Sequence, residues 1–367
     1  MKVNDIIREL EQWAPPALQE EYDNSGLLCG DPEAEVTSAL VSLDLTDDIL
    51  EEADEKGCTL VISHHPFLFR PVRRVVAGTP VYRILSKALS KGISLYAMHT
   101  NVDNLYSGLN RVLTQKLDLT DVRILQPKKE MLLKLVTFCP PSHADQVRIA
   151  LFEAGAGHIG NYDQCSYNLQ GKGSFRGSDE THPFAGQKNM LHFEEETRIE
   201  VIVPAYLERQ VVSAMKKNHP YEEVAYDLYP LANAFEQAGA GMVGNLKGPL
   251  SSQSFLERVA SLFRLPVLRH SPVIKDNVSR IALCSGSGAF LAKDAILAGA
   301  DVFLTADLKY HDFQDAGNTL VLADIGHFES EVWVKELFRD VLIEKFPTFA
   351  VLISEREVNP VRYLINQ

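Results

Sequence analysis

The chain has 367 residues, of which 46% are hydrophobic and 23% are charged, and its formal net charge is −13. This composition suits a globular protein with well-filled cores, and the length predicts about two or three domains. The acidic balance argues against a protein that coats nucleic acid, because such binding depends on Lys and Arg placed against phosphates.

Cysteine usage and hydropathy indicate the compartment. The five cysteines are scattered without a C-x-x-C pair, which is typical of reduced thiols. Residues 1–5 lack the pattern of a signal peptide, and no stretch approaches the ~20 apolar residues that span a bilayer. We therefore expect a cytoplasmic protein without membrane contact.

The first third of the chain alternates predicted helices and strands. Apolar residues repeat at helical spacing until Pro15 and Pro16 stop the pattern, and Thr46 has the position of a helix N-cap. In chain order we predict a helix at 3–13, a strand at 36–43, a helix at 46–57, a strand at 59–62, a helix at 81–89 and a strand at 93–98. Such alternation predicts an α/β fold with a mainly parallel sheet.

The middle segment, residues 130–232, has a different pattern. Its predicted elements are a strand at 132–138, a helix at 144–154, strands at 164–169 and 198–203, a helix at 208–218 and a strand at 224–228. This order is that of a ferredoxin-like α+β module. We therefore predict that residues 130–232 are an insert.

The last third returns to the α/β pattern after a Gly- and Ala-rich segment, 233–250, which we interpret as a linker. The predicted elements are a helix at 255–263, a strand at 280–284, a helix at 289–298, a strand at 302–305, a helix at 306–316, a strand at 320–323 and a helix at 327–345. The first and last thirds share one pattern, so residues 1–129 and 233–367 are predicted to form one discontinuous domain.

Histidines and carboxylates follow predicted strands at three places. His64 and His65 come directly after the strand at 59–62, and His99 and Asp103 after the strand at 93–98. The third place is the start of the last predicted helix. Ligands of open parallel sheets bind beyond the carboxyl ends of the strands, so these side chains are expected to meet.

The last cluster consists of His327 and Glu331, four residues apart, which therefore share one face of a helix. Adjacent residues such as His64 and His65 face opposite sides of a regular strand, so both reach one site only if the strand has ended; Pro66 favours that end. A lone histidine at a strand end is usually a hydrogen-bonded residue without a metal, but three such clusters favour a metal site.

The candidate ligands supply only nitrogen and oxygen donors; they are His64, His65, Asp103, His327 and Glu331. If one carboxylate bridges two ions, each ion has three protein ligands and an open position, as in catalytic zinc sites. We favour Glu331 as the bridge, with Asp103 as the alternative. This predicts two divalent cations per subunit, with zinc preferred over manganese, iron or cobalt.

Three further features have candidate roles. His99 is the candidate catalytic residue, as a partner of a ligand or a carrier of protons. The Ser-Gly-Ser-Gly sequence at 285–288 is interpreted as a tight turn or, alternatively, as an anion site. The polar residues at 307–312 fit a surface helix and a substrate-facing helix equally well.

Several motifs together resemble those of the GTP cyclohydrolase 1 type 2 homologues, also called NIF-three-like proteins. The motifs are YDNSGL at 22–27, SHHP at 63–66, HTNVD at 99–103, DLKYH at 307–311 and GHFESE at 326–331. The resemblance covers about residues 1–127 and 235–367. It implies that the five candidate ligands match the family's two-metal centre position by position.

The resemblance also carries expectations about fold and assembly. It implies two similar α/β halves around the metal centre and a toroidal homohexamer. It further implies that residues 130–232 are the PII- or CutA-like insert of the longer family members.

We consider three functions. The leading one is a metal-dependent hydrolase, GTP cyclohydrolase-like or phosphoesterase-like, acting on a nucleotide or related small molecule through metal-activated water. The alternative is a non-catalytic metal-binding regulatory assembly whose insert senses a small ligand or ion. A ring around DNA is disfavoured by the charge and by the absence of basic runs with interleaved aromatics.

Overall fold

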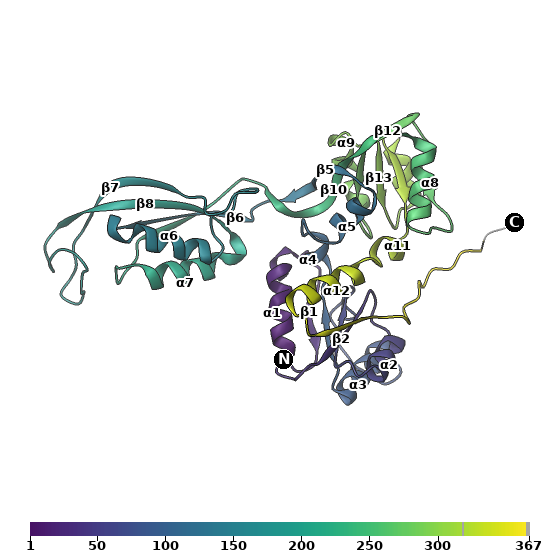
Figure 1. Ribbon diagram of the computed structural model, residues 1–367, viewed down its shortest axis with the longest axis horizontal. Coiled ribbons are helices and arrows are strands. Elements are labelled where there is room, and N and C mark those ends of the chain that lie inside the picture. The colour runs from purple at the N-terminus through teal and green to yellow at the C-terminus, as the bar shows by residue number, and fades with distance from the viewer. Residues whose placement is uncertain (318, 365–367) are drawn as a thin grey trace. The chain divides into compact units, whose positions relative to one another are not determined.

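The computed structural model describes residues 1–317 and 319–364, which form two compact units (Figure 1). Unit one comprises Met1–Gln126 together with the chain from Ala238 onward, and unit two comprises Pro127–Gln237. Both units combine helices with β-sheet, which confirms the α/β class. Among the described residues, no helix has the length and apolar character needed to cross a membrane.

Unit one contains two sheets, and the first has five strands in the order β1-β4-β3-β2-β15. The strands are β1 (Gly26–Cys29), β2 (Ser38–Ser42), β3 (Leu60–Ser63), β4 (Ser94–Ala97) and β15 (Ala350–Ile353). All neighbours are parallel except β1 with β4. The predicted parallel arrangement is thus confirmed for this sheet.

Helices cover both faces of the first sheet. They are α1 (Val3–Trp13), α2 (Asp47–Glu55), α3 (Pro80–Lys91) and α12 (Val334–Lys345). Leu10 of α1 and Phe338 of α12 belong to one apolar core, and Leu50 of α2 and Ala88 of α3 belong to the other. Successive side chains of a buried strand point to opposite faces, so each strand contributes to both cores.

The second sheet of unit one has six strands in the order β11-β14-β13-β12-β10-β5. The strands are β5 (Thr120–Lys128), β10 (Phe235–Ser251), β11 (Arg269–His270), β12 (Asn277–Leu283), β13 (Val302–Thr305) and β14 (Val321–Asp324). Strands β12, β13 and β14 are parallel, whereas β10 and β11 pair antiparallel with their neighbours β12 and β14.

The helices that pack on this second sheet are α5 (Leu109–Lys116), α8 (Ser252–Leu262), α9 (Ala292–Leu297) and α10 (Tyr310–Ala316). Leu113 of α5 and Phe255 of α8 pack on one side of the sheet, and Ala295 of α9 and Ala316 of α10 on the other. Shorter elements are α4 (Thr100–Asp103), α11 (His327–Glu331) and the 3₁₀ turns η1 (Pro16–Leu18) and η4 (Ala289–Leu291).

Unit two is built on a four-stranded antiparallel sheet in the order β7-β8-β6-β9. Its elements are β6 (Leu132–Cys139), η2 (Pro141–His143), α6 (Ala144–Glu153), β7 (Tyr167–Phe175), β8 (His192–Pro204), η3 (Ala205–Leu207), α7 (Glu208–Asn218) and β9 (Tyr226–Pro230). Figure 1 shows α6 and α7 side by side on one face of this sheet, and Leu151 and Val211 share its core.

Three sequence predictions differ from the structure. The segment 233–250 is not a linker, because β10 occupies most of it and pairs with β12 in the middle of the second sheet. The predicted helix at 327–345 is two helices, α11 and α12, with a break between Glu331 and Val334. The predicted helix at 306–316 also starts later, at Tyr310.

Candidate metal centre

The local backbone explains how two adjacent histidines reach one place. The N–H groups of His64 and His65 both donate to the Leu43 carbonyl, at 3.1 and 2.9 Å, just after β3 ends. The chain has therefore left the pleated geometry that would send the two rings to opposite faces. The centroids of the two rings lie 5.2 Å apart.

The other predicted residues come from α4 and α11. His99 is the N-cap of α4 and Asp103 its last residue, and His327 and Glu331 are the first and last residues of α11. The fold thus brings all six predicted site residues together in unit one, in three overlapping groups whose potential ligand atoms lie within 4.8 Å of one another. The groups are His65 with His327 and Glu331, His64 with Asp103 and Glu331, and His64 with His65 and His99. We call these six residues the cluster.

Glu331 is the common member of two groups. Its Oε2 lies 2.9 Å from Nε2 of His65 and 2.9 Å from Nε2 of His327. On the other side of the cluster, His64 Nε2 lies 3.6 Å from Asp103 Oδ1. A carboxylate that faces both groups of donors has the position that a bridging ligand needs.

Oxygen atoms outside the cluster fix the orientation of each imidazole. Nδ1 of each ring contacts one oxygen: His64 contacts the Met98 carbonyl at 2.8 Å, His65 Asp44 at 2.8 Å, His99 Asp23 at 2.8 Å and His327 Asp307 at 2.7 Å. Each oxygen accepts a hydrogen bond from the Nδ1–H group, so Nε2 is the atom that each ring offers to the cluster. Metal-binding histidines in proteins are held in this way.

The charge states show what the cluster does without a cation. Burial opposes protonation of His65 and His327, but neighbouring carboxylates outweigh it and raise the pKa values to about 10 and about 9. Burial lowers the pKa of His64 to about 3, and burial together with the charge of Glu331 raises the pKa of Asp103 to about 7. Protons on His65 and His327 therefore balance the buried carboxylate of Glu331.

Two buried atoms show that protons alone do not satisfy the cluster. His64 Nε2 and Glu331 Oε2 have no hydrogen-bond partner of acceptable geometry, although Oε2 lies close to two imidazoles. Buried donors and acceptors are rarely left unpaired, because desolvation without a partner costs about 1–3 kcal/mol. Imidazole and carboxylate are ligands of divalent zinc, manganese, iron or cobalt, so the residues present fit a metal ion.

Gly286 makes room for the central carboxylate. It has a φ of +57°, and a Cβ built on it would lie 2.1 Å from Glu331 Oε1. The N–H groups of Ser285 and Gly286 donate to Asn110 Oδ1 at 2.8 Å and Ser330 Oγ at 3.0 Å. The glycine-rich loop is thus a tight turn against the cluster, and these two N–H groups are not available to an anion.

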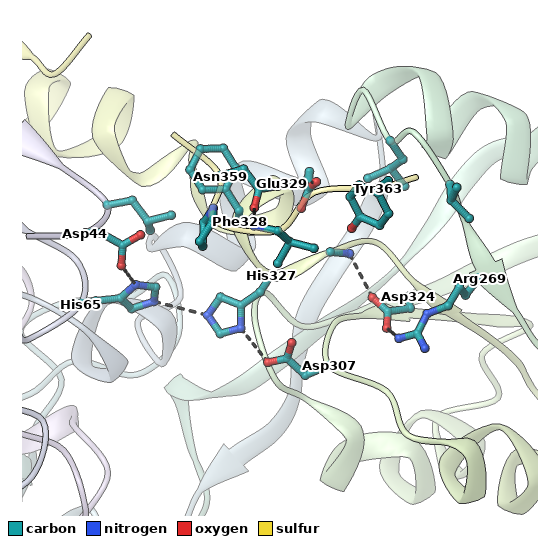
Figure 2. A pocket seen from close by; sticks show the side chains of 16 residues that line it. Asp44, His65, Arg269, Asp307, Asp324, His327, Phe328, Glu329, Asn359 and Tyr363 are labelled. Carbon is teal, nitrogen blue, oxygen red and sulfur yellow. Dashed lines mark hydrogen bonds and ion pairs between the residues drawn. The ribbon is translucent and has the colours of Figure 1, made fainter. Parts of the chain in front are cut away.

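A cavity of about 580 Å³ adjoins the cluster on the side of His65 and His327. Figure 2 shows a continuous line of contacts across its wall, from Asp44 through the two imidazoles to Asp307. Farther along, Arg269 is paired with Asp324, and other lining residues include Phe328, Glu329 and Tyr363. The cavity therefore offers carboxylates and rings, with its arginine already engaged.

Sequence reasoning missed three carboxylates that orient histidines. Asp44 follows β2 at the same sheet edge as His64, so the strand-end rule could have found it. Asp23 lies in the YDNSGL motif and Asp307 in the polar patch, but neither spacing indicated a contact with a histidine. In that patch the Lys309 N–H donates to Asp312 at 2.7 Å, and Tyr310 is 77% exposed, so these residues behave as a helix start at the surface.

The fold and the cluster define an α/β protein with a partly buried histidine–carboxylate site that can hold metal. The model of the family described as Duf34/NIF3 (NGG1p interacting factor 3) matches residues 1–360, and the chain belongs to this family. This confirms the resemblance seen in the motifs.

Similar proteins cover nearly the whole chain. A protein of Halalkalibacterium halodurans named GTP cyclohydrolase 1 type 2 homolog is 38% identical over 364 residues, 98% of each chain. A protein of Bacillus subtilis with the same name is 34% identical over 365 residues, again 98% of each. A crystal structure of a Bacillus cereus protein related to NIF3 is 34% identical, with a TM-score of 0.86 over 99% of each chain.

Proposed function

We propose that the protein is a metal-dependent hydrolase with two divalent cations in the cluster. His65, His327 and Glu331 would hold one cation, and His64, Asp103 and Glu331 would hold the other. The observation that carries the proposal is the buried Glu331 carboxylate, which belongs to both groups and whose Oε2 has no hydrogen-bond partner of acceptable geometry. Zinc is the preferred metal, with manganese, iron or cobalt as alternatives.

Each side chain has a role in this proposal. Divalent cations supply Lewis acidity and lower the pKa of water. His99 offers Nε2 to the cluster, because Asp23 holds its Nδ1 at 2.8 Å, so His99 is placed to take a proton from water or to deliver one to a leaving group. Asp23 is buried and accepts further hydrogen bonds from Thr100, which keeps this pair rigid.

The proposed substrate is a nucleotide or a related small molecule. The cavity of about 580 Å³ beside His65 and His327 has the size of a small-molecule site. Relatives that match 98% of the chain carry the name GTP cyclohydrolase 1 type 2 homolog, which favours opening of a purine ring. Cleavage of a phosphoester is the alternative, because paired divalent cations also support that reaction.

Metal content and turnover, measured together, test the proposal. We expect purified protein to contain two divalent ions per chain by elemental analysis and to hydrolyse at least one member of a panel of nucleotides and phosphoesters. His64→Ala should lose metal and turnover together. His311→Ala, which changes a histidine outside the cluster, should lose neither. Turnover by metal-free His64→Ala protein would refute the proposal.

The alternative is a regulatory assembly without catalysis, in which unit two senses a small ligand or ion. The observation that favours it is that Pro127–Gln237 forms a compact unit with its own core. This alternative predicts metal binding without turnover on any substrate of the panel, and a ligand-dependent change in unit two.

We also infer a ferredoxin-like, PII- or CutA-like fold for unit two, two similar halves in unit one, and a cytoplasmic homohexamer. The antiparallel sheet with both helices on one face supports the first inference. Light scattering on the purified protein tests the hexamer, and a monomeric mass would exclude it.

A further inference from the structure

Unit two contains a cavity of about 330 Å³ whose wall combines aromatic rings with carboxylates. Its main lining residues are Phe138, Phe175, Phe184, Glu196 and Tyr221, and we call it the aromatic pocket. We propose that the aromatic pocket binds a small organic cation that carries an ammonium group. The site is distinct from the cluster and does not depend on the proposed hydrolase function.

Glu196 is the carboxylate around which the pocket is built. It lies on β8 against Gly173 of β7, where a Cβ on the glycine would lie 2.1 Å from Glu196 Oε2. The Tyr221 hydroxyl donates to Oε1 at 2.9 Å. Oε2 accepts no hydrogen bond from the described residues, so one oxygen is oriented and the other is left for a ligand.

The rings of the pocket are held in place around Tyr221. Its ring centroid lies 6.1 Å from that of Phe175 and 6.0 Å from that of Phe184. Its N–H donates to His219 Nδ1 at 3.1 Å, and Nε2 of the same imidazole donates to the Phe138 carbonyl at 3.0 Å. Ring faces beside a carboxylate attract cations, and quaternary ammonium groups are bound in proteins by such walls.

The charges of the pocket disfavour an anionic ligand. Its lining contains three carboxylates, Glu196, Glu222 and Glu223, against one cation, Arg176, so an anion is disfavoured. A metal ion is also disfavoured, because every group of described residues that can hold one belongs to the cluster in unit one. Burial and the hydrogen bond to Glu196 raise the pKa of the Tyr221 hydroxyl, which therefore remains a donor and leaves the negative charge on Glu196.

Choline and its uncharged carbon isostere are the probes, titrated into the full-length protein by calorimetry. We expect choline to bind saturably at one site per chain and the isostere to bind at least ~10-fold more weakly, because only the charge differs. Glu196→Gln should weaken choline binding by about 10-fold. The matched control is Glu195→Gln on the same strand; that exposed carboxylate pairs with Lys172 and does not line the pocket, so binding should be unchanged.

Equal affinity for choline and the isostere, or equal loss in the Glu195 and Glu196 variants, would overturn the proposal. If thermal melting shows that Glu196→Gln does not fold, choline binding is measured with Phe184→Ala instead. Phe184 is 54% exposed, so removing its ring leaves the core intact. That variant should also weaken choline binding, and unchanged binding would contradict the proposal. His64→Ala should bind choline normally, which separates this test from the test of metal-dependent hydrolysis.

Discussion

At the scale of single residues, the candidate site is defined as much by the oxygens behind the histidines as by the histidines themselves. Four imidazoles present Nε2 to the cluster because Nδ1 of each is held by an oxygen. The sequence predicted the imidazoles, because strand ends of a parallel sheet converge. It did not predict the partner of Nδ1, because that contact depends on how separate loops pack.

Asp307→Asn tests this orientation. The carboxylate contacts His327 Nδ1 at 2.7 Å, and replacing it by an amide removes the charge that supports the ring. We expect about 10–100-fold weaker metal binding, the usual effect of losing such a partner. A competition titration with a metal chelator measures it. Asp312→Asn, which changes a nearby helix cap, is the control, and equal losses in both variants would contradict the role of Asp307.

Gly286→Ala tests the space beside Glu331. A Cβ would lie 2.1 Å from Glu331 Oε1, so the carboxylate must move and metal binding should fall by at least ~10-fold. The control is Gly299→Ala, which has a φ of +74° and nothing within 4 Å of the new Cβ. Both variants place a Cβ on a residue with positive φ, which costs about 1 kcal/mol in each. Only Gly286→Ala also displaces the Glu331 carboxylate, so only this variant should lose metal in elemental analysis. Metal loss in both would assign the effect to strain.

At the scale of elements, the errors of sequence reasoning have packing explanations. Strand β10 was predicted as a linker because it is rich in glycine. A Cβ on Gly241 would lie 2.8 Å from the Leu283 carbonyl, and one on Gly244 would lie 3.0 Å from the Thr120 carbonyl. Neighbouring backbone approaches so closely there that small residues are required, and local propensity cannot show this.

The prediction of a single helix over 327–345 was wrong for a different reason. Apolar spacing continues from α11 into α12, so the periodicity alone favours one helix over 327–345. In the structure α11 ends at Glu331, a cluster residue whose side chain is 3% exposed. The short first helix places His327 and Glu331, and the second packs Phe338 into the core of the first sheet.

Glu52 of α2 binds the residues that follow β15 through its carboxylate. Its carboxylate accepts hydrogen bonds from Ser354 Oγ at 2.6 Å and the Glu355 N–H at 2.9 Å, and it pairs with Lys56 at 2.7 Å. Burial opposes its ionisation, but these partners outweigh burial and lower the pKa from 4.5 to about 2. The stabilisation is therefore complete above pH 4.5 and is lost as the pH falls towards 2.

Glu52→Gln should reduce the free energy of unfolding by about 2 kcal/mol at pH 7, because the charged form makes these bonds. Below pH 4.5 the difference between wild type and variant should shrink as the wild-type carboxylate is protonated. Urea unfolding at a series of pH values measures both. Glu51→Gln, an exposed neighbour paired with Lys87, is the control; a constant difference at every pH would exclude the assigned role.

At the scale of the whole molecule, the chain leaves unit one through β5 and returns through β10, which are neighbouring strands of one sheet. The change of pattern near residue 130 was visible in the sequence, because each unit has its own order of strands and helices. The α/β class was predictable for the same reason. The pairing of β15 with β2 was not, because nothing local to residues 350–353 indicates a partner more than 300 residues away.

Replacing residues 129–233 by a short glycine-rich turn tests the independence of the units. The two apolar cores of the first sheet and those of the second contain no residue from the removed segment. We expect the shortened chain to fold, to bind metal as the full chain does, and to lose choline binding. Circular dichroism and elemental analysis measure the first two, and loss of metal would show that unit two supports the cluster.

Strand β15 and helix α11 have a consequence for biosynthesis. The first sheet acquires its outer strand, and the imidazoles near its edge acquire Glu331, only when residues 327–353 have been synthesised. While a ribosome is still making those residues, His64 and His65 lack Glu331, the carboxylate that belongs to a group with each of them. Premature termination before residue 327 would therefore yield a product that retains four of the six cluster residues and cannot complete either of the groups built on Glu331.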